Sequence, residues 1–450
     1  MIVHVLLLVL LASVAEATTY YVRTDGNNAN AGTTNSAGGA WATIGYAAAN
    51  ATVAGDLVLI QDGTYTEGEI DLNSAGTSGS RIVFRAQNAL RAILASTARG
   101  DLGQQAIVFN ANYVTVDGLK IIKDSGTTGS PPAGAYYTVR CLGSNVPTAA
   151  SPSTGIVGCT FTNGFIDYIA HFYGGWKSNQ DNSELSFSTV YSAEIFNNSD
   201  SIIRGNTIYS TVPGGRQGSC LYTKGGAHRT IVDRNICHIT ADGDIGLYAG
   251  GDSSTSYLYD SGTGYESYDV AIRNNFVYLD PGVPIPQNYM LGARSSSAPV
   301  FYNNSAYGSA YVQDNRFESP SPNTDASTWK NNTMDCRGQK AHRDDPSVSS
   351  GGWTYNTAPT IDYNNYYNCT INIPTQTHGF TSNPLFVSTT DLHLQSGSPM
   401  RDVGLTIGSF SNDIDGETRP QGSAWDIGAD EYTVAGGSFP LGKAKGLGLF

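Results

Sequence analysis

The stretch IRGNTI at residues 203–208 decides the fold, because closely similar segments return along the chain. Each copy has an apolar residue, two further residues, an asparagine, one residue and a second apolar residue. The other copies are VDRNIC at 232–237, IRNNFV at 272–277, FYNNSA at 301–306, WKNNTM at 329–334 and IDYNNY at 361–366. A repeat with a period of about 20–50 residues is typical of a solenoid or another repeat array.

The asparagine position recurs at unequal intervals, which predicts that short strands repeat while their connections vary in length. Two earlier, degenerate copies carry Leu119 and Cys159 in this position. The series then continues with Asn206, Asn235, Asn275, Asn304, Asn332 and Asn364. Apolar and polar residues alternate within each unit, which favours strands. Asparagine tolerates the left-handed conformation of a turn, and stacked amides can hydrogen-bond in a ladder.

These observations predict an all-β protein, a right-handed parallel β-helix over residues 56–410. A β-propeller or β-sandwich would show even blade lengths or hairpin signals instead. In AWATIGYAAANAT (40–52) apolar residues fall near helical spacing, so residues 18–55 are predicted to form a strand and a short capping helix. Residues 411–435 are expected to close the array and 436–450 to form a flexible tail.

The closing segment carries four charged side chains that we interpret as a structural salt-bridge cluster, with a Ca²⁺ site as the alternative. They are Asp415, Arg419, Asp426 and Glu431.

Composition excludes several classes of protein. The 450 residues carry 25 Lys+Arg against 38 Asp+Glu, a formal charge of −13, which argues against a nucleic-acid partner. A hydrophobic content of 40% argues against disorder. The 52 glycines argue against a helical protein, because glycine interrupts helices.

The amino terminus resembles an export signal. Residues 2–14 are apolar but shorter than the roughly 20 residues that span a bilayer. Ala15-Glu16-Ala17 matches the cleavage pattern of a signal peptide, so residues 1–17 are expected to be removed. An uncleaved anchor is the alternative. We therefore expect a secreted protein, extracellular or periplasmic, that is monomeric and has no membrane contact after cleavage.

Six cysteines follow the predicted signal peptide, and none has a CxxC spacing. Export permits disulfides, although buried thiols are an equal alternative for most of these residues. Cys336 and Cys369 follow ladder asparagines by similar distances, so they should lie on adjacent rungs about 4.8 Å apart. They are the pair that we expect to form a disulfide.

A second repeat lies upstream of the first and ends in Gly-Gly. It reads HFYGG at 171–175, YTKGG at 222–226 and LYAGG at 247–251, and LGARS at 291–295 continues it. The position before Gly-Gly holds Tyr173, Lys224 and Ala249. If successive rungs place these residues in one column, its mixed chemistry suits a substrate groove better than a core.

Three segments resemble secreted parallel β-helix proteins of the polysaccharide-lyase-like group. They are YYVRTDGN with AWATIGYAAAN and AGDLVLIQDGTYTE near the start, YTKGGAHRTIVDRNIC in the middle, and NPLF with DIDGETRP and DIGADEY at the end. The resemblance covers most of residues 19–432. It implies the β-helix scaffold.

Lyases that act on uronic-acid polymers neutralise the substrate carboxylate, remove the C5 proton and assist the leaving oxygen. Lys224 is the candidate base, because a cation such as Arg229 would lower the pKa of its ammonium group. Arg294 is the candidate for gripping a carboxylate. Candidates for proton transfer are Tyr222, His171 and His228. For each residue, a surface or packing role is the alternative.

Asp242, Asp244 and Asp252 surround the LYAGG segment and are candidate Ca²⁺ ligands, or a carboxylate pair for a hydrolase. Turn formation beside Gly243 is the alternative. Four tyrosines are candidates for stacking on sugar rings: Tyr173, Tyr248, Tyr257 and Tyr259. The sequence thus predicts a carbohydrate-active protein, first a polysaccharide lyase, with a glycoside hydrolase or a glycan-binding adhesin as alternatives.

Overall fold

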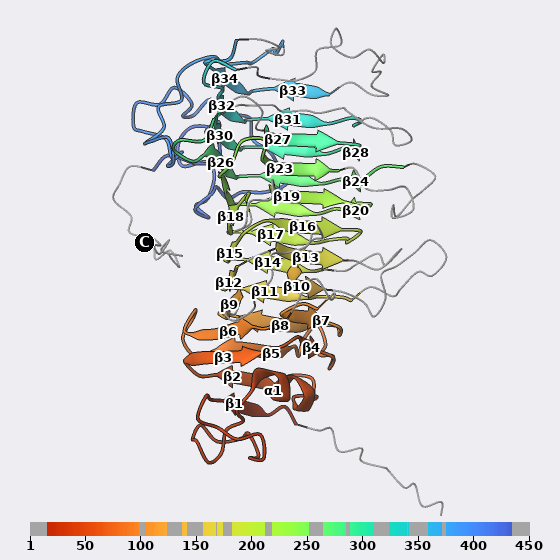
Figure 1. Cartoon of the computed structure of the whole chain (residues 1–450). Coiled ribbons are helices and arrows are strands. Elements are labelled where there is room, and N and C mark those ends of the chain that lie inside the picture. The colour runs from red at the N-terminus through yellow and green to blue at the C-terminus, as the bar shows by residue number, and fades with distance from the viewer. Residues whose placement is uncertain are drawn as a thin grey trace, which may run out of the picture.

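The computed structural model describes thirteen parts of the chain, and the predicted tail lies outside them. They are residues 16–98, 104–123, 137–141, 156–167, 169–173, 182–211, 218–251, 264–284, 289–308, 324–339, 341, 359–370 and 375–433. Short strands stack from the N-terminal to the C-terminal end in long parallel sheets (Figure 1). The fold is a parallel β-helix, as the sequence predicts.

Each described rung contributes one strand to several sheets. Sheet A contains β1 (Thr19–Val22), β2 (Leu57–Ile60), β5 (Ile82–Ala86), β8 (Val114–Asp117), β11 (Thr160–Thr162), β14 (Glu184–Ser186), β17 (Ile202–Arg204), β21 (Ile231–Asp233), β25 (Ala271–Arg273), β29 (Val300–Tyr302), β31 (Thr328–Lys330) and β33 (Thr360–Asp362). Sheet B contains β3 (Gly63–Glu67), β6 (Ala92–Ser96), β9 (Lys120–Lys123), β12 (Phe165–Ile166), β15 (Thr189–Val190), β18 (Thr207–Tyr209), β22 (Ile236–Ile239), β26 (Phe276–Leu279), β30 (Ser305–Tyr307), β32 (Thr333–Asp335) and β34 (Asn365–Tyr367).

Two further sheets complete the coil. Sheet C contains β4 (Ile70–Leu72), β7 (Ile107–Phe109), β10 (Tyr137–Cys141), β13 (Ile169–Tyr173), β16 (Ala193–Phe196), β19 (Ser219–Lys224), β23 (Ile245–Gly250) and β27 (Tyr289–Arg294). A small sheet contains β20 (Ala227–His228), β24 (Ser267–Tyr268) and β28 (Ser296–Ser297). Because strand side chains alternate between faces, the middle residue of each short sheet A strand points into the core, where Phe301 and Trp329 stack.

The asparagine ladder is confirmed at the turn between sheets A and B. From Asn206 to Asn364, each Nδ2 donates to the Oδ1 of the next asparagine at 2.8–3.0 Å. Each backbone N–H donates to that same oxygen at 2.8–3.1 Å. Gln376 ends the ladder, because its Oε1 accepts from Asn364 Nδ2 at 3.0 Å. The ladder asparagines are buried. Their side chains therefore satisfy backbone groups that water does not reach.

The register expected for Cys159 was wrong. The ladder position directly precedes each sheet B strand, and in that rung it is held by Gly164, whereas Cys159 precedes β11. A further rung, with Ser188 in the ladder position, lies before Asn206 and was missed. Neither Gly nor Ser matches an asparagine pattern, although Ser188 N–H still donates to Asn206 Oδ1 at 3.0 Å. The left-handed backbone conformation expected for the ladder asparagine belongs instead to the residue before it, for example Arg234 with φ 59°.

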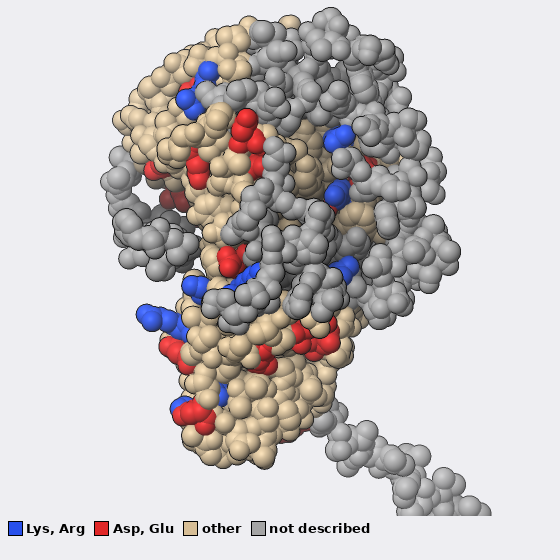
Figure 2. Space-filling model, in the orientation of Figure 1, with Lys and Arg blue, Asp and Glu red and all other residues tan. Residues whose placement is uncertain are grey.

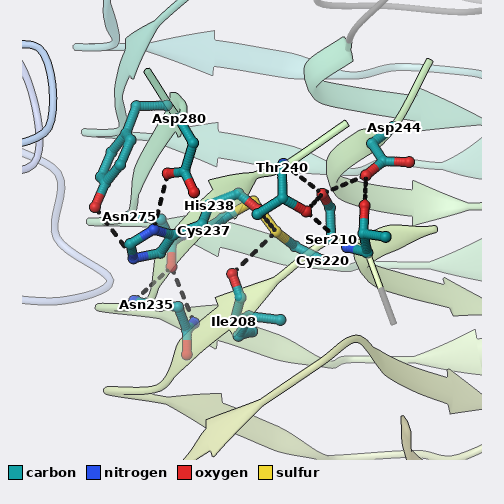
Figure 3. The surroundings of a disulfide bond; sticks show 12 residues. Ile208, Ser210, Cys220, Asn235, Cys237, His238, Thr240, Asp244, Asn275 and Asp280 are labelled. Carbon is teal, nitrogen blue, oxygen red and sulfur yellow. Dashed lines mark hydrogen bonds and ion pairs between the residues drawn. A yellow bond between two sulfur atoms is a disulfide. The ribbon is translucent and has the colours of Figure 1, made fainter. Parts of the chain in front are cut away.

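All six cysteines form disulfides. Cys336–Cys369 is confirmed, with Cα atoms 4.9 Å apart. Two pairs were not predicted: Cys141–Cys159 and Cys220–Cys237. The second of these joins β19 to β22 through the core of one rung (Figure 3). Sequence spacing could not find it, because its partners face each other across the coil rather than along it.

Removing the Cys220–Cys237 disulfide should lower the free energy of unfolding by about 2–4 kcal/mol, as the loss of a native crosslink usually does. The double variant Cys220→Ser with Cys237→Ser avoids a lone thiol, and urea unfolding measures the change. An unchanged urea midpoint would show that the crosslink does not stabilise the rung.

The predicted capping helix is confirmed as α1 (Ile44–Asn50). Thr43 is its N-cap, and its Oγ1 accepts from the Tyr46 N–H at 3.2 Å. The Glu67 carboxylate accepts from the N–H groups of Ile44 and Gly45 at 2.7 and 2.8 Å. These bonds satisfy donors that have no partner inside a helix.

The C-terminal segment, residues 380–433, folds back beside sheet B at the left of Figure 1. Asn303 Nδ2 donates to the Asp426 carbonyl at 3.0 Å, and Ala429 N–H donates to Ser305 Oγ at 2.9 Å. Phe276 and Tyr278 pack against Leu392 and Ala429. Part of the outer face of sheet B is thereby covered.

Of the expected salt-bridge cluster, only the pair Arg419–Glu431 forms among these four residues, fully buried at 2.8 Å. Asp426 accepts backbone hydrogen bonds instead of joining an ion pair, from the N–H groups of Asp402 and Tyr432. Asp415 lies 2.9 Å from His393 Nε2, a partner the sequence did not suggest.

His393 carries the group of side chains in the described chain that most resembles a metal site, together with Asp415 and Asp430. However, its Nδ1 faces Asp391 and its Nε2 faces Asp415, so both ring nitrogens already meet carboxylates. Burial alone would lower the pKa of His393, but these bonds and the charge of Asp430 outweigh it and raise the pKa to about 10. The positive charge among these carboxylates is therefore supplied by the His393 imidazolium and not by a metal ion.

Stability should fall as the pH rises through the raised pKa of His393. A raised pKa contributes stability that is complete below the ordinary value of 6.5 and is lost as the pH approaches about 10. The expected loss is about 1–2 kcal/mol, since the side chain is 35% exposed and screened by solvent. The unfolding free energy of His393→Gln, measured across this range, should lack that component. Equal pH dependence in both proteins would contradict the assignment.

Candidate functional site

The outer face of sheet C aligns chemically diverse side chains on successive strands. Residues at core-facing positions of these strands, such as Leu221 and Leu247, are fully buried. Strand register places the alternate residues in one row, which we call the sheet C column: Arg140, His171, Glu194, Tyr222 and Tyr248. Neighbours in this row are about 4.8 Å apart along the solenoid. For His171 the structure describes the backbone position alone.

Lys224 lies two residues after Tyr222, in the neighbouring row on the same face of sheet C, and its side chain extends over the sheet C column. Its Nζ lies 2.7 Å from Glu194 Oε1 and 5.5 Å from the centre of the Tyr222 ring. The Lys224 and Glu194 side chains are 22% and 14% exposed, so a proton donor and a proton acceptor meet with limited access to water. Tyr222 also contacts Tyr248 edge to face, with ring centres 5.9 Å apart.

Glu194 is the main residue that sequence reasoning missed. Its rung, AEIF on β16, lacks the Gly-Gly that marked the neighbouring strands. The available signal was the strand itself, because alternation in AEIF points the glutamate outward beside two buried apolar residues.

Two glycines give the site its shape. A Cβ at Gly251 would lie 2.8 Å from Lys224 Cδ, so the lysine stem lies over this residue. A Cβ at Gly292 would lie 2.1 Å from the ring of Tyr248, which crosses the strand there. At the base of the site, Glu266 is fully buried and accepts from the Gly225 N–H at 2.9 Å. The Gly-Gly signal in the sequence therefore reflects space and turn geometry around Lys224.

The expected row of Tyr173, Lys224 and Ala249 was partly wrong. Tyr173 and Lys224 do share a row, with Phe196 between them. Ala249 faces the core instead, because Tyr248 pairs with Tyr222 and the residue after it points to the opposite face of the strand.

Arg294 pairs with Gly250 and so lies next to the Lys224 row, close to the position expected for it. Its backbone carbonyl accepts from the Gly251 N–H at 3.1 Å.

The other proton-transfer candidates lie beyond the Gly225-Gly226 turn. The His228 ring packs against Tyr268, with ring centres 4.5 Å apart. Arg229 makes two hydrogen bonds of 2.7 Å to the Asp200 carboxylate. The sequence hypothesis placed the cation Arg229 beside Lys224. The charged group described beside Lys224 is instead the carboxylate of Glu194. The stacking candidates Tyr257 and Tyr259 lie outside the described residues, as does the Tyr173 side chain.

Of the three predicted calcium ligands, the structure describes Asp242 and Asp244. Asp244 is fully buried and accepts from Ser210 Oγ at 2.6 Å (Figure 3). It also accepts from Thr211 Oγ1 at 2.5 Å and from the Gly218 N–H at 2.9 Å. Its oxygens thus tie two rungs together. Asp242 is exposed, and Asp252 lies outside the described residues. The Asp244 geometry does not fit a Ca²⁺ ligand, so no chemical step is assigned to a metal.

A second titratable cluster lies on sheet B. His238 Nδ1 is 3.0 Å from Asp280 Oδ1, and its Nε2 is 3.1 Å from the Tyr278 hydroxyl (Figure 3). Burial raises the pKa of Tyr278, which keeps the phenol protonated. Because Tyr278 is 5% exposed and packs under the C-terminal segment, this cluster serves packing.

In the view of Figure 2, the Lys and Arg side chains of the described surface are scattered, some of them beside Asp or Glu, and form no broad basic patch. Within the described residues, no helix is long and apolar enough to cross a membrane.

Comparison with known proteins places the fold among parallel β-helix proteins. The structure of XylC in complex with xylose matches over 92% of this chain and 98% of its own, with 12% identity and a TM-score of 0.52. Pectate lyase Pel9A (15% identity, 94% and 98% coverage, TM-score 0.41) and a rhamnogalacturonan lyase (15%, 77% and 87%, 0.46) are also similar. At such identity the likeness shows the fold alone. No family model and no curated protein sequence matches the chain.

Proposed function

We propose that the outer face of sheet C is the active site of a polysaccharide lyase acting on a uronic-acid polymer. The observation that carries this proposal is the pair Lys224–Glu194, a proton donor and acceptor 2.7 Å apart beside the ring of Tyr222. β-Elimination requires a base that takes the C5 proton and an acid that assists the leaving oxygen, and this pair offers one group for each task. Aromatic rings give a sugar an apolar surface on which to stack.

The cations near this pair suit an anionic polymer. Arg140 lies in the sheet C column and Arg294 beside the Lys224 row. A guanidinium can hold a carboxylate by two parallel hydrogen bonds. Holding the uronate carboxylate in this way withdraws charge and makes the adjacent C5 proton more acidic.

Glycoside hydrolysis is less well supported than elimination. A hydrolase uses two carboxyl groups about 5–9.5 Å apart. Across strands β10 to β27 of sheet C, however, Glu194 is the one carboxylate. The other carboxylate at the site, Glu266, is fully buried at its base and accepts from the Gly225 N–H. An adhesin would bind the same polymer on this face without cleaving it.

A panel of uronic-acid polymers tests the proposal. Cleavage should create the ultraviolet absorbance of a C4–C5 double bond, and Lys224→Ala should abolish it. Binding of the polymers without any cleavage would replace the lyase by the adhesin. Activity that survives EDTA would show that cleavage needs no calcium, whereas loss of activity and its recovery with Ca²⁺ would show that it does.

We also propose export with cleavage after Ala17. In support, the Thr18 nitrogen lies 2.8 Å from Oδ1 of Asp56, a fully buried carboxylate. Cleavage would turn this nitrogen into an ammonium and the contact into a charge-assisted bond. The mass of the protein secreted by an expression host should therefore correspond to a chain that begins at Thr18. A secreted chain that begins elsewhere would refute this site.

A further inference from the structure

We propose that Glu194 is the base and Lys224 the acid of the elimination, and that the substrate is a uronic acid whose H5 and O4 lie on the same face of the ring. This inference rests on the proposed lyase function. It differs from the sequence hypothesis, in which Lys224 was the base. It starts from the placement of both groups on one surface, on neighbouring strands β16 and β19.

The ion pair has the charges that this assignment needs. An ammonium can donate a proton and a carboxylate can accept one, so both groups start in the protonation states that the elimination uses. Lys224 acting as base would first have to lose its proton beside Glu194, 2.7 Å away, which is the less favourable starting state.

The elimination balances with these two groups alone. The Glu194 carboxylate takes the C5 proton, and the C5–H electron pair forms the C4–C5 double bond. The C4–O4 bond breaks, and O4 takes a proton from the Lys224 ammonium. Glu194 is then a carboxylic acid and Lys224 an amine. One proton passing from Glu194 to Lys224 across their contact restores the ion pair.

The common origin of the two groups limits the stereochemistry. Both side chains rise from the outer face of sheet C and meet, so they approach a bound sugar from one side. In D-mannuronic and D-glucuronic acids, H5 and O4 lie on the same ring face. In D-galacturonic and L-guluronic acids they lie on opposite faces, which would require acid and base on both sides of the sugar.

The surrounding residues hold the pair in this arrangement. Gly251 leaves room for the lysine stem, and buried Glu266 fixes the turn that follows Lys224. Tyr222 sits between Glu194 and Tyr248 in the column, where its ring also contacts the ammonium. Acid–base groups positioned in advance avoid the cost of ordering them during the reaction.

The polymer test compares epimers. Wild-type protein should form unsaturated products from polymannuronate or a glucuronate polymer and none from polygalacturonate or polyguluronate. Cleavage of galacturonate or guluronate alone would overturn this inference and leave the lyase standing. Cleavage of no polymer would overturn the proposed function itself.

The variant test distinguishes the loss of a catalytic base from the loss of folded structure. Glu194→Ala should lower kcat by about 10²–10⁴-fold, and added formate should restore part of it by replacing the missing carboxylate. Lys224→Met should lower kcat similarly without formate rescue. Arg85→Gln, which breaks the exposed Arg85–Asp117 pair on sheet A, is the matched control and should keep wild-type activity. Full activity of Glu194→Ala, or a loss of kcat that formate does not rescue in a folded variant, would remove Glu194 as the base.

Discussion

Asn275→Ala should destabilise the protein by about 3–4 kcal/mol, because each buried polar group left without a partner costs about 1–3 kcal/mol. Asn275 Oδ1 accepts from both the backbone N–H and Nδ2 of Asn235, and its own Nδ2 donates to Asn304 Oδ1. Alanine would therefore leave the Asn235 N–H without an acceptor, and Asn235 Nδ2 and Asn304 Oδ1 would each lose one partner. Urea unfolding followed by circular dichroism measures the loss.

Asn88→Ala is the control for this prediction. Asn88 is exposed and bonds to Asp62 at 3.1 Å, so its loss should cost less than about 0.5 kcal/mol. If both variants unfolded at the same urea concentration, the ladder would not be a main source of stability.

Gly251→Ala should lower kcat on the preferred polymer by roughly 10²-fold, since displacing a reacting group by about 1 Å can cost that much. The new Cβ would lie 2.8 Å from Lys224 Cδ and 2.9 Å from its Cβ, so the lysine must move from Glu194. Initial rates under saturating substrate measure the effect.

Gly38→Ala is the matched control, because nothing lies within 4 Å of a Cβ built there. It should keep wild-type kcat. A Gly251→Ala protein that is folded and fully active would show that the exact placement of the ammonium does not matter.

The repeat predicted the fold well because, in a solenoid, equivalent structural positions recur many times along the sequence. Asn206 to Asn364 were found because each fills the same buried turn position. Gly164 and Ser188 fill that position with other chemistry, so their rungs were misplaced or missed. The Cys336–Cys369 disulfide follows the stacking direction, whereas Cys220–Cys237 crosses the coil and needs the three-dimensional path.

The candidate site could be predicted in part. Lys224, Tyr222 and Tyr248 were singled out by sequence, and the structure brings them together on sheet C. Glu194 was missed, since a single outward glutamate on a short strand has no local signature. The pairing of Tyr222 with Tyr248, which turns Ala249 into the core, was missed because the shared Gly-Gly aligned the two segments one residue out of register.

The mass of the products formed from polymannuronate tests the central claim most directly. Elimination at sheet C predicts oligosaccharides lighter by one water than the corresponding hydrolysis products, formed by wild-type protein and absent with Glu194→Ala. Products of the full hydrolytic mass would show that water is added at the cleaved bond, and would contradict the lyase account.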